Sequence, residues 1–142
     1  MRQPTLRQLF PWIAMALLAG CSMDALKPTA ARALDLAFYE FSSDVRWGDF
    51  EAAYAFVDPK TKAEHPLTDL ERARFKQVEV SSYDVVSRVD GIGIVDQQVQ
   101  LGLINRNTQI PRSIVYHEHW RWDAEKKKWW LVSGLPDIAP QD

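Results

Sequence analysis

The chain has 142 residues, with 17 Lys and Arg against 19 Asp and Glu, and its formal net charge is −2 at pH 7. It therefore lacks the basic field that nucleic-acid binding uses, and its single cysteine excludes an internal disulfide. The length suits one domain that is stabilised by packing around a hydrophobic core.

The first segment of the chain pairs two positive side chains with a short apolar stretch. Arg2 and Arg7 are its only charged residues, and residues 9–19 are predominantly apolar. A membrane-spanning helix needs about 20 apolar residues, so this stretch is too short to span. A positive start followed by a short apolar run is typical of a secretory signal peptide.

The apolar stretch ends in four residues that resemble the lipobox of bacterial lipoproteins, Leu18-Ala19-Gly20-Cys21. Cys21 is the only cysteine of the chain and stands where lipidation requires a thiol. The resemblance implies that residues 1–20 are a lipoprotein signal peptide and that acylated Cys21 becomes the first mature residue. The alternative is an ordinary secretory signal that happens to end near a cysteine.

The residues after the lipobox indicate where the protein resides. Two or more acyl chains anchor a protein stably, and the resemblance implies that class. Ser22 follows the cysteine in place of Asp, and the family rule then implies the periplasmic face of the outer membrane. Residues 21–28 form a lipidated tether that reaches about 25 Å when fully extended. We therefore expect the lipid bilayer as a partner through acylated Cys21.

Three helices are expected in the first half of the mature chain. Residues 29–45 carry apolar side chains at spacings of three and four, which predicts an amphipathic helix. Asp49 is a candidate N-cap for a short second helix that ends near residue 57. Thr68 and Glu71 have the spacing of a capping box for a third helix over residues 69–75. Residues 59–67 are polar and are expected to be irregular.

The second half of the chain changes to the period of a strand. Alternating apolar and polar residues, separated by turn signals, predict four antiparallel strands over residues 78–89, 92–104, 109–122 and 129–135. Helices that precede strands indicate an α+β domain with the helices packed on one face of a curved sheet. The expected organisation is a single domain over residues 29–136, followed by a loose tail over residues 137–142.

Local phrases along these elements resemble the nuclear-transport-factor-2-like (NTF2-like) superfamily. They are Gly48-Asp49-Phe50-Glu51-Ala52-Ala53-Tyr54, Leu70-Glu71-Arg72-Ala73-Arg74-Phe75, and the ending Trp120-Arg121-Trp122 with Trp129-Trp130-Leu131-Val132. The resemblance implies a cone, in which a strongly curved sheet wraps over three helices and leaves a pocket at the wide end. This superfamily contains isomerases, dehydratases and many non-catalytic members, so the fold by itself does not decide the function.

Glu118 is the candidate catalytic residue, because it lies on the apolar parity of its strand between Tyr116 and Trp120. A buried carboxylate must be paired or hydrogen-bonded, and burial can raise its pKa to that of a general base. It could equally form a salt bridge with an arginine or lie in water at the mouth of the cone. The side chains that could accompany it are Tyr116, Tyr83, Asp84, Arg112 and Arg88.

His117 and His119 are the candidate metal ligands, since residues two apart on a strand point to one face. His65 is the only other histidine and would have to be the third ligand. The strand parity argues against this site, because His117 and His119 share the polar face of the strand with Ser113 and Arg121. We expect no metal and no other cofactor.

Four tryptophans lie close together on the last two strands: Trp120, Trp122, Trp129 and Trp130. They can be core residues, but Trp129 and Trp130 point to opposite faces of their strand. An aromatic outer face would suit a homodimer or a protein partner. The sequence thus favours an outer-membrane-anchored periplasmic lipoprotein that binds a protein partner or a small apolar ligand. The alternative is an isomerase or hydrolase with Glu118 as its general base.

Overall fold

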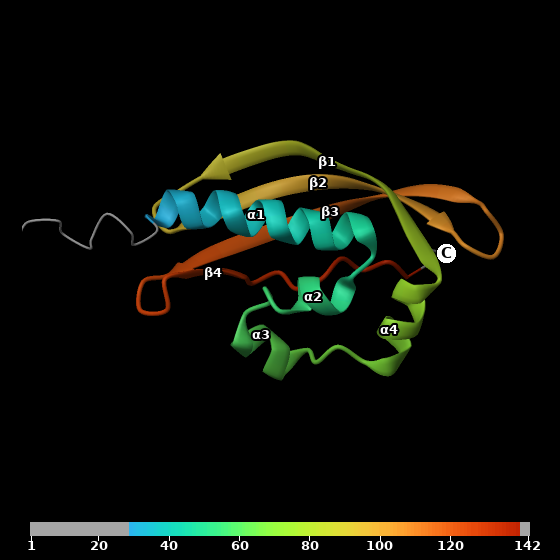
Figure 1. The fold of residues 1–142 in the computed structure, drawn as a ribbon, viewed down its shortest axis with the longest axis horizontal. Helices are drawn as coiled ribbons and strands as arrows, with labels where there is room; N and C mark the ends of the chain where they lie inside the picture. Colours follow the sequence, from blue (N-terminus) through green and yellow to red (C-terminus); the bar gives the residue numbers. More distant parts are fainter. Residues whose placement is uncertain (1–28, 140–142) are drawn as a thin grey trace, which may run out of the picture.

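The computed structural model describes residues 29–139, in which four helices precede four strands (Figure 1). The elements are α1 (Ala30–Trp47), α2 (Phe50–Tyr54), α3 (Pro59–Glu64), α4 (Asp69–Lys76), β1 (Val78–Asp90), β2 (Ile94–Asn105), β3 (Pro111–Asp123) and β4 (Lys128–Leu131). The lipobox, the tether and residues 140–142 lie outside the described residues. Within them, no helix combines the length and the apolar character that crossing a membrane requires.

The long helix α1 forms where the apolar spacing predicts it. The hydroxyl of Thr29 caps its first turn by accepting from the backbone N–H of Arg32. Its buried side chains follow the helical period and face the sheet: Leu34, Ala37, Phe41 and Val45. The helix ends at Gly48, whose φ of 75° is a left-handed conformation that glycine adopts without strain.

The capping signals of α2 and α4 are confirmed, but the expectation of three helices is wrong. Asp49 caps α2, and Thr68 with Glu71 forms the capping box of α4. The additional helix α3 lies in the segment that was expected to be irregular, and Asp58 caps it with Pro59 in its first turn. None of the residues of α3 is buried, so its sequence lacks the apolar spacing by which a helix is usually predicted.

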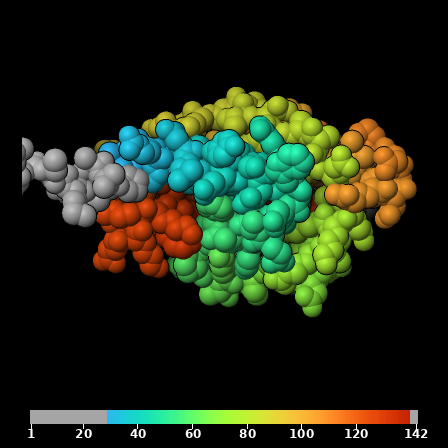
Figure 2. Space-filling model, in the orientation of Figure 1, coloured from blue at the N-terminus to red at the C-terminus, as the bar shows by residue number. Residues whose placement is uncertain are grey.

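The four strands form an antiparallel sheet in the order β1-β2-β3-β4, as expected for a meander. Two register shifts interrupt the pairing of β1 with β2. Figure 1 shows β1, β2 and β3 as long, gently arched strands with α1 along one face. The strong curvature of the sheet that the resemblance implied is therefore not found. Figure 2 shows the helices covering much of this face.

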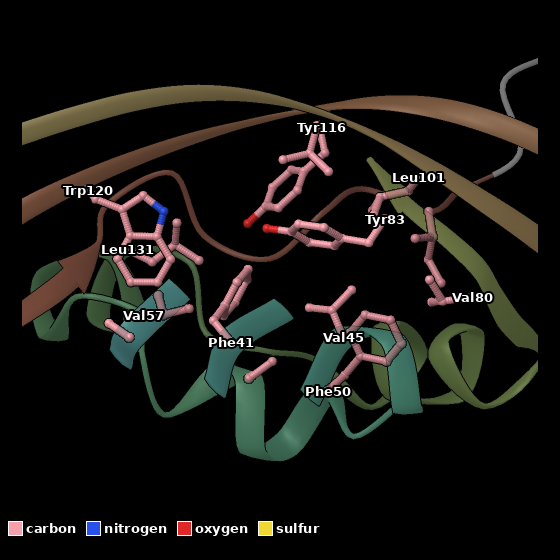
Figure 3. Close-up of a cluster of buried hydrophobic side chains, with 14 of the residues drawn as sticks. Phe41, Val45, Phe50, Val57, Val80, Tyr83, Leu101, Tyr116, Trp120 and Leu131 are labelled. Atoms are coloured by element: carbon pink, nitrogen blue, oxygen red, sulfur yellow. The ribbon is translucent and has the colours of Figure 1, made fainter. Parts of the chain in front are cut away.

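The core lies between α1 and the inner face of the sheet (Figure 3). Trp120 of β3 is fully buried at its centre and meets Phe41 and Phe38 of α1 edge-to-face, with ring centroids 5.2 Å apart in both pairs. This geometry is the favoured one for aromatic pairs and adds to the gain from burying the ring. These aromatic contacts therefore join α1 to β3 at the centre of the core.

The end of the domain differs from the loose tail that was expected. Ile138 is 4% exposed and belongs to the core. The guanidinium of Arg112, on β3, donates to the backbone carbonyls of both Ile138 and Ala139. The segment after β4 is thus packed without regular structure, because side chains of other elements satisfy its backbone groups. The packed domain extends to at least residue 139.

Candidate functional site

Glu118 is the most deeply buried carboxylate among the described residues, at 1% exposure. Its Oε1 accepts a hydrogen bond of 2.5 Å from the hydroxyl of Tyr83 on β1. Its Oε2 accepts from the side-chain amide of Gln97 on β2 at 2.6 Å and from the indole N–H of Trp120 at 2.9 Å. Four side chains from three strands thus form one network, called the Glu118 network below.

This arrangement decides between the three environments that were considered for Glu118. Neither of the two arginines that were considered reaches the carboxylate: Arg88 pairs with Asp90 at 2.6 Å, and Arg112 binds backbone carbonyls near Ile138. The carboxylate is not in water either, since it is almost fully buried. Its desolvation is offset by three hydrogen bonds instead of an opposite charge.

The charges of the network follow from burial. Burial raises the pKa of Glu118 above its ordinary value, although the hydrogen bonds from Tyr83, Trp120 and Gln97 act in the opposite direction. Burial, and then the neighbouring Glu118 carboxylate, raise the pKa of Tyr83 far above its usual range. Tyr83 therefore remains a neutral donor at every physiological pH.

The other two candidate partners of Glu118 do not join the network. Tyr116 is buried on the same face, and Figure 3 shows its hydroxyl pointing toward that of Tyr83. That hydroxyl donates to the backbone carbonyl of Gly134 at 2.6 Å, and burial raises the pKa of Tyr116 well above its usual range. Asp84 is exposed on the opposite face of the sheet from Tyr83.

The histidines that were considered as candidate metal ligands do not converge on a common centre. His117 and His65 are exposed. The Nδ1 atom of His119 lies 2.5 Å from a carboxylate oxygen of Asp96 on β2. The part of the chain that the structure describes contains no group of three or more His, Cys, Asp or Glu that could hold a metal ion.

The four tryptophans do not form the interaction surface that was predicted for them. Trp120 and Trp129 are core residues, and Trp122 is half-buried against Trp129 with ring centroids 5.5 Å apart. Trp130 does point to the outer face but is only 8% exposed. The ammonium groups of Lys128 and Lys126 lie 4.2 and 5.5 Å from the centre of its ring. These two lysines thus help to cover the aromatic outer face. The alternation of side chains along one strand does not predict such a cover.

A cavity of about 650 Å³ lies between the three short helices and the segment after β4, and we call it the helical pocket. Its walls include apolar side chains, among them Tyr54, Leu67, Leu70, Phe75, Leu135 and Ile138. Ionisable side chains stand among them: Glu64, His65, Glu71, Arg74 and Asp137. Glu118 is not part of this lining, nor of a smaller cavity of about 440 Å³ between α1 and β1.

Hydrogen bonds hold the walls of the helical pocket in place. The hydroxyl of Thr61 donates to the carbonyl of Val132 at 3.0 Å, which ties α3 to the segment after β4. The hydroxyl of Tyr54 accepts from the backbone N–H of Leu67 at 3.2 Å, which fixes the α3–α4 connection. The pocket is therefore largely preformed, as small-molecule sites usually are. Sequence reasoning missed it because its walls come from residues 59–67, which were expected to be irregular, and from residues 133–139, which were expected to be the end of the last strand and the tail.

A scan of protein-family models and a search of curated proteins found no match to this chain. Among solved structures, it is similar to the solution structure of a SEC-C motif containing protein from Rhodopseudomonas palustris. The TM-score is 0.54 at 13% sequence identity, over 78% of this chain and 83% of that chain. It also matches the crystal structure of a protein described as an NTF2-like transpeptidase from Campylobacter jejuni, with a TM-score of 0.40, 15% identity and coverage of 70% and 95%. The first likeness shows a shared α+β fold and nothing beyond it.

Proposed function

We propose that this chain is an outer-membrane lipoprotein, anchored through acylated Cys21, whose periplasmic domain is NTF2-like and binds a small apolar ligand in the helical pocket. The observation that supports binding is the pocket itself. Its volume of about 650 Å³ lies within the range of small-molecule sites, roughly 300–1,000 Å³. The lipobox and the short tether support the anchoring.

The lining of the helical pocket suggests the chemistry of the ligand. Leu70 lines the pocket and is 61% exposed, although burying an apolar side chain is favourable in free energy. Arg74 lies one turn further along the same helix and is half-buried. An apolar ligand with one anionic or polar end would cover the first side chain and pair with the second.

The alternative function, an enzyme with Glu118 as general base, has less support. A general base must come within hydrogen-bond reach of the proton that it removes, directly or through one water. Both carboxylate oxygens of Glu118 already accept hydrogen bonds inside the core, and neither of the two cavities includes this residue. A protein partner or a second copy at the sheet face also has less support, since Trp130 is covered there.

Native mass spectrometry of the mature chain, gently purified from membranes, tests the binding proposal. We expect a bound species that is released on activation in the gas phase. Leu70→Arg should reduce its occupancy at least several-fold, because the added charge would lie against the apolar part of the ligand. Val115→Arg is the matched control, since Val115 is 56% exposed on β3 and does not line the pocket. A bare wild-type chain, or equal occupancy in Leu70→Arg and wild type, would argue against the pocket as the site.

A further inference from the structure

The β1–β2 turn places an isoleucine entirely in solvent. Ile92 is 104% exposed and stands between two glycines, of which Gly93 has a φ of 69°. The backbone N–H of Gly91 donates to the carbonyl of Ile94 at 2.9 Å and closes the turn. Val89 and Ile94 flank the turn with 69% and 41% of their surface exposed. We call these three apolar residues, Val89, Ile92 and Ile94, the apolar tip.

The apolar tip lies at the end of the domain where the tether begins. The backbone N–H of Trp122 donates to the carbonyl of Gly93 at 2.9 Å, so the turn is held against β3. Trp122 pairs with Trp129 across the sheet, and the indole of Trp129 donates to the carbonyl of Ala30 at 2.8 Å. Ala30 is the first residue of α1. Figure 1 shows the start of α1, the tip of β1 and the β3–β4 turn at one end of the molecule.

The length of the tether brings this end to the bilayer. Only seven residues, 22–28, separate Cys21 from the cap of α1, and they span about 25 Å when fully extended. The apolar tip is therefore held within reach of the membrane that carries the anchor. Clustered exposed apolar side chains typically mark contact with a protein or a membrane. Because the tether is so short, the membrane is the contact that the apolar tip would make.

The charges around the tip favour apolar contact over binding to anionic lipid. Lys126 and Lys127, in the β3–β4 turn, are exposed at this end and suit the level of the lipid headgroups. Glu125 in the same turn and Asp90 beside the tip are also exposed, so the end has no strong positive field.

We infer that the apolar tip inserts into the headgroup region of the bilayer that holds the acylated cysteine, and that it orients the domain. The inference rests on the proposed function, since it needs the anchor. β1 is about 40 Å long at 3.3 Å per residue. The apolar tip lies at the C-terminal end of β1, and α4 leads into its N-terminal end. Because α4 lines the helical pocket, insertion of the tip would turn the pocket away from the membrane.

Fluorescence of the mature lipidated chain with a single labelled thiol tests this insertion. Because the proposed function has Cys21, the single cysteine, acylated, Ile92→Cys would supply the one thiol that the environment-sensitive dye NBD can label. In vesicles of phosphatidylethanolamine with a minor share of phosphatidylglycerol, we expect a blue-shifted emission and a several-fold gain in intensity. The reference is the same labelled chain in buffer without lipid or detergent. The control is Asn107→Cys in the exposed β2–β3 turn at the opposite end, which should show neither change.

Three outcomes would overturn either the insertion or the anchor on which it rests. Equal emission from the two labelled positions in vesicles, with an acylated chain by intact mass, would overturn the insertion alone. A blue shift at position 92 that grows with protein concentration in lipid-free buffer would show that a second copy covers the tip, which also overturns it. A chain whose intact mass lacks the acyl groups would refute the anchor, and with it the proposed function.

Discussion

Glu118→Leu is expected to lower the free energy of unfolding by about 3–5 kcal/mol. Leucine fills a similar volume but accepts no hydrogen bond. The hydroxyl of Tyr83, the amide of Gln97 and the indole N–H of Trp120 would all lose their acceptor in the core. Each buried donor left without a partner costs about 1–3 kcal/mol, and the removal of a buried carboxylate offsets part of the sum. Chemical denaturation followed by circular dichroism measures the loss.

Glu118→Gln is the matched control, because its amide can keep a hydrogen bond to each of the three partners without the charge, with the direction of the one to Tyr83 reversed. Its oxygen can accept from Gln97 and Trp120, while its NH₂ group donates to the hydroxyl of Tyr83. Burial holds the folded-state pKa of Glu118 above the ordinary 4.5, so the wild type loses stability as pH rises from 4.5 through the folded pKa. The glutamine variant should lack this loss and should equal or exceed the wild type in stability at pH 8. A glutamine variant as unstable as the leucine variant would contradict the proposed role of Glu118.

Trp120→Ala is expected to cost about 3–5 kcal/mol, the usual range for removing a large buried aromatic side chain. The indole is fully buried and contacts Phe41 and Phe38 edge-to-face. Its loss would also leave Glu118 with two donors in place of three. Since a domain of this size is stable by only about 5–15 kcal/mol, a large share of the stability would disappear. Thermal and urea unfolding measure the effect.

Two further substitutions separate the contributions of Trp120. Trp120→Phe keeps an aromatic ring but removes the N–H, and we expect a smaller loss of about 1–3 kcal/mol. Trp47→Ala removes a tryptophan that is 85% exposed at the end of α1, so the change should stay within about 0.5 kcal/mol. Similar losses in Trp47→Ala and Trp120→Ala would contradict the assignment of the core.

The order of helices before strands could be predicted because it depends on local patterns. The apolar period of α1 reports which face is buried, and the capping residues Asp49 and Thr68 mark where two short helices begin. The parity of β3 also predicted correctly that Glu118 faces the core. Such patterns carry over to the structure because each depends on neighbours in the chain.

The parts that were missed depend on contacts between distant segments. Helix α3 has no buried face, and its start is stabilised by Asp58, which Arg121 of β3 holds at 2.8 Å. Ile138 packs into the core, and Arg112 of β3 donates to its backbone carbonyl. Asp58 and Pro59 could nonetheless have predicted the start of α3, since an acidic N-cap followed by proline is typical of a helix start.

The Glu118 network was predictable in part. Tyr83 was named as a candidate partner, and the structure brings it to the carboxylate. Gln97 was missed, although it lies on the apolar parity of β2 between Val95 and Val99. A polar residue on an apolar parity must find a buried partner, so two such residues on neighbouring strands are candidates for each other. Only the register, in which Gln97 stands opposite Glu118, identifies the pair.

We propose that acylated Cys21 anchors this domain, and intact mass spectrometry of the chain purified from bacterial membranes tests the anchor. We expect a chain that begins at Cys21 and carries a diacylglyceryl group with a further acyl chain, and a Cys21→Ser variant that keeps residues 1–20 and carries no lipid. An unmodified wild-type chain, or a Cys21→Ser variant processed and membrane-bound like the wild type, would contradict it.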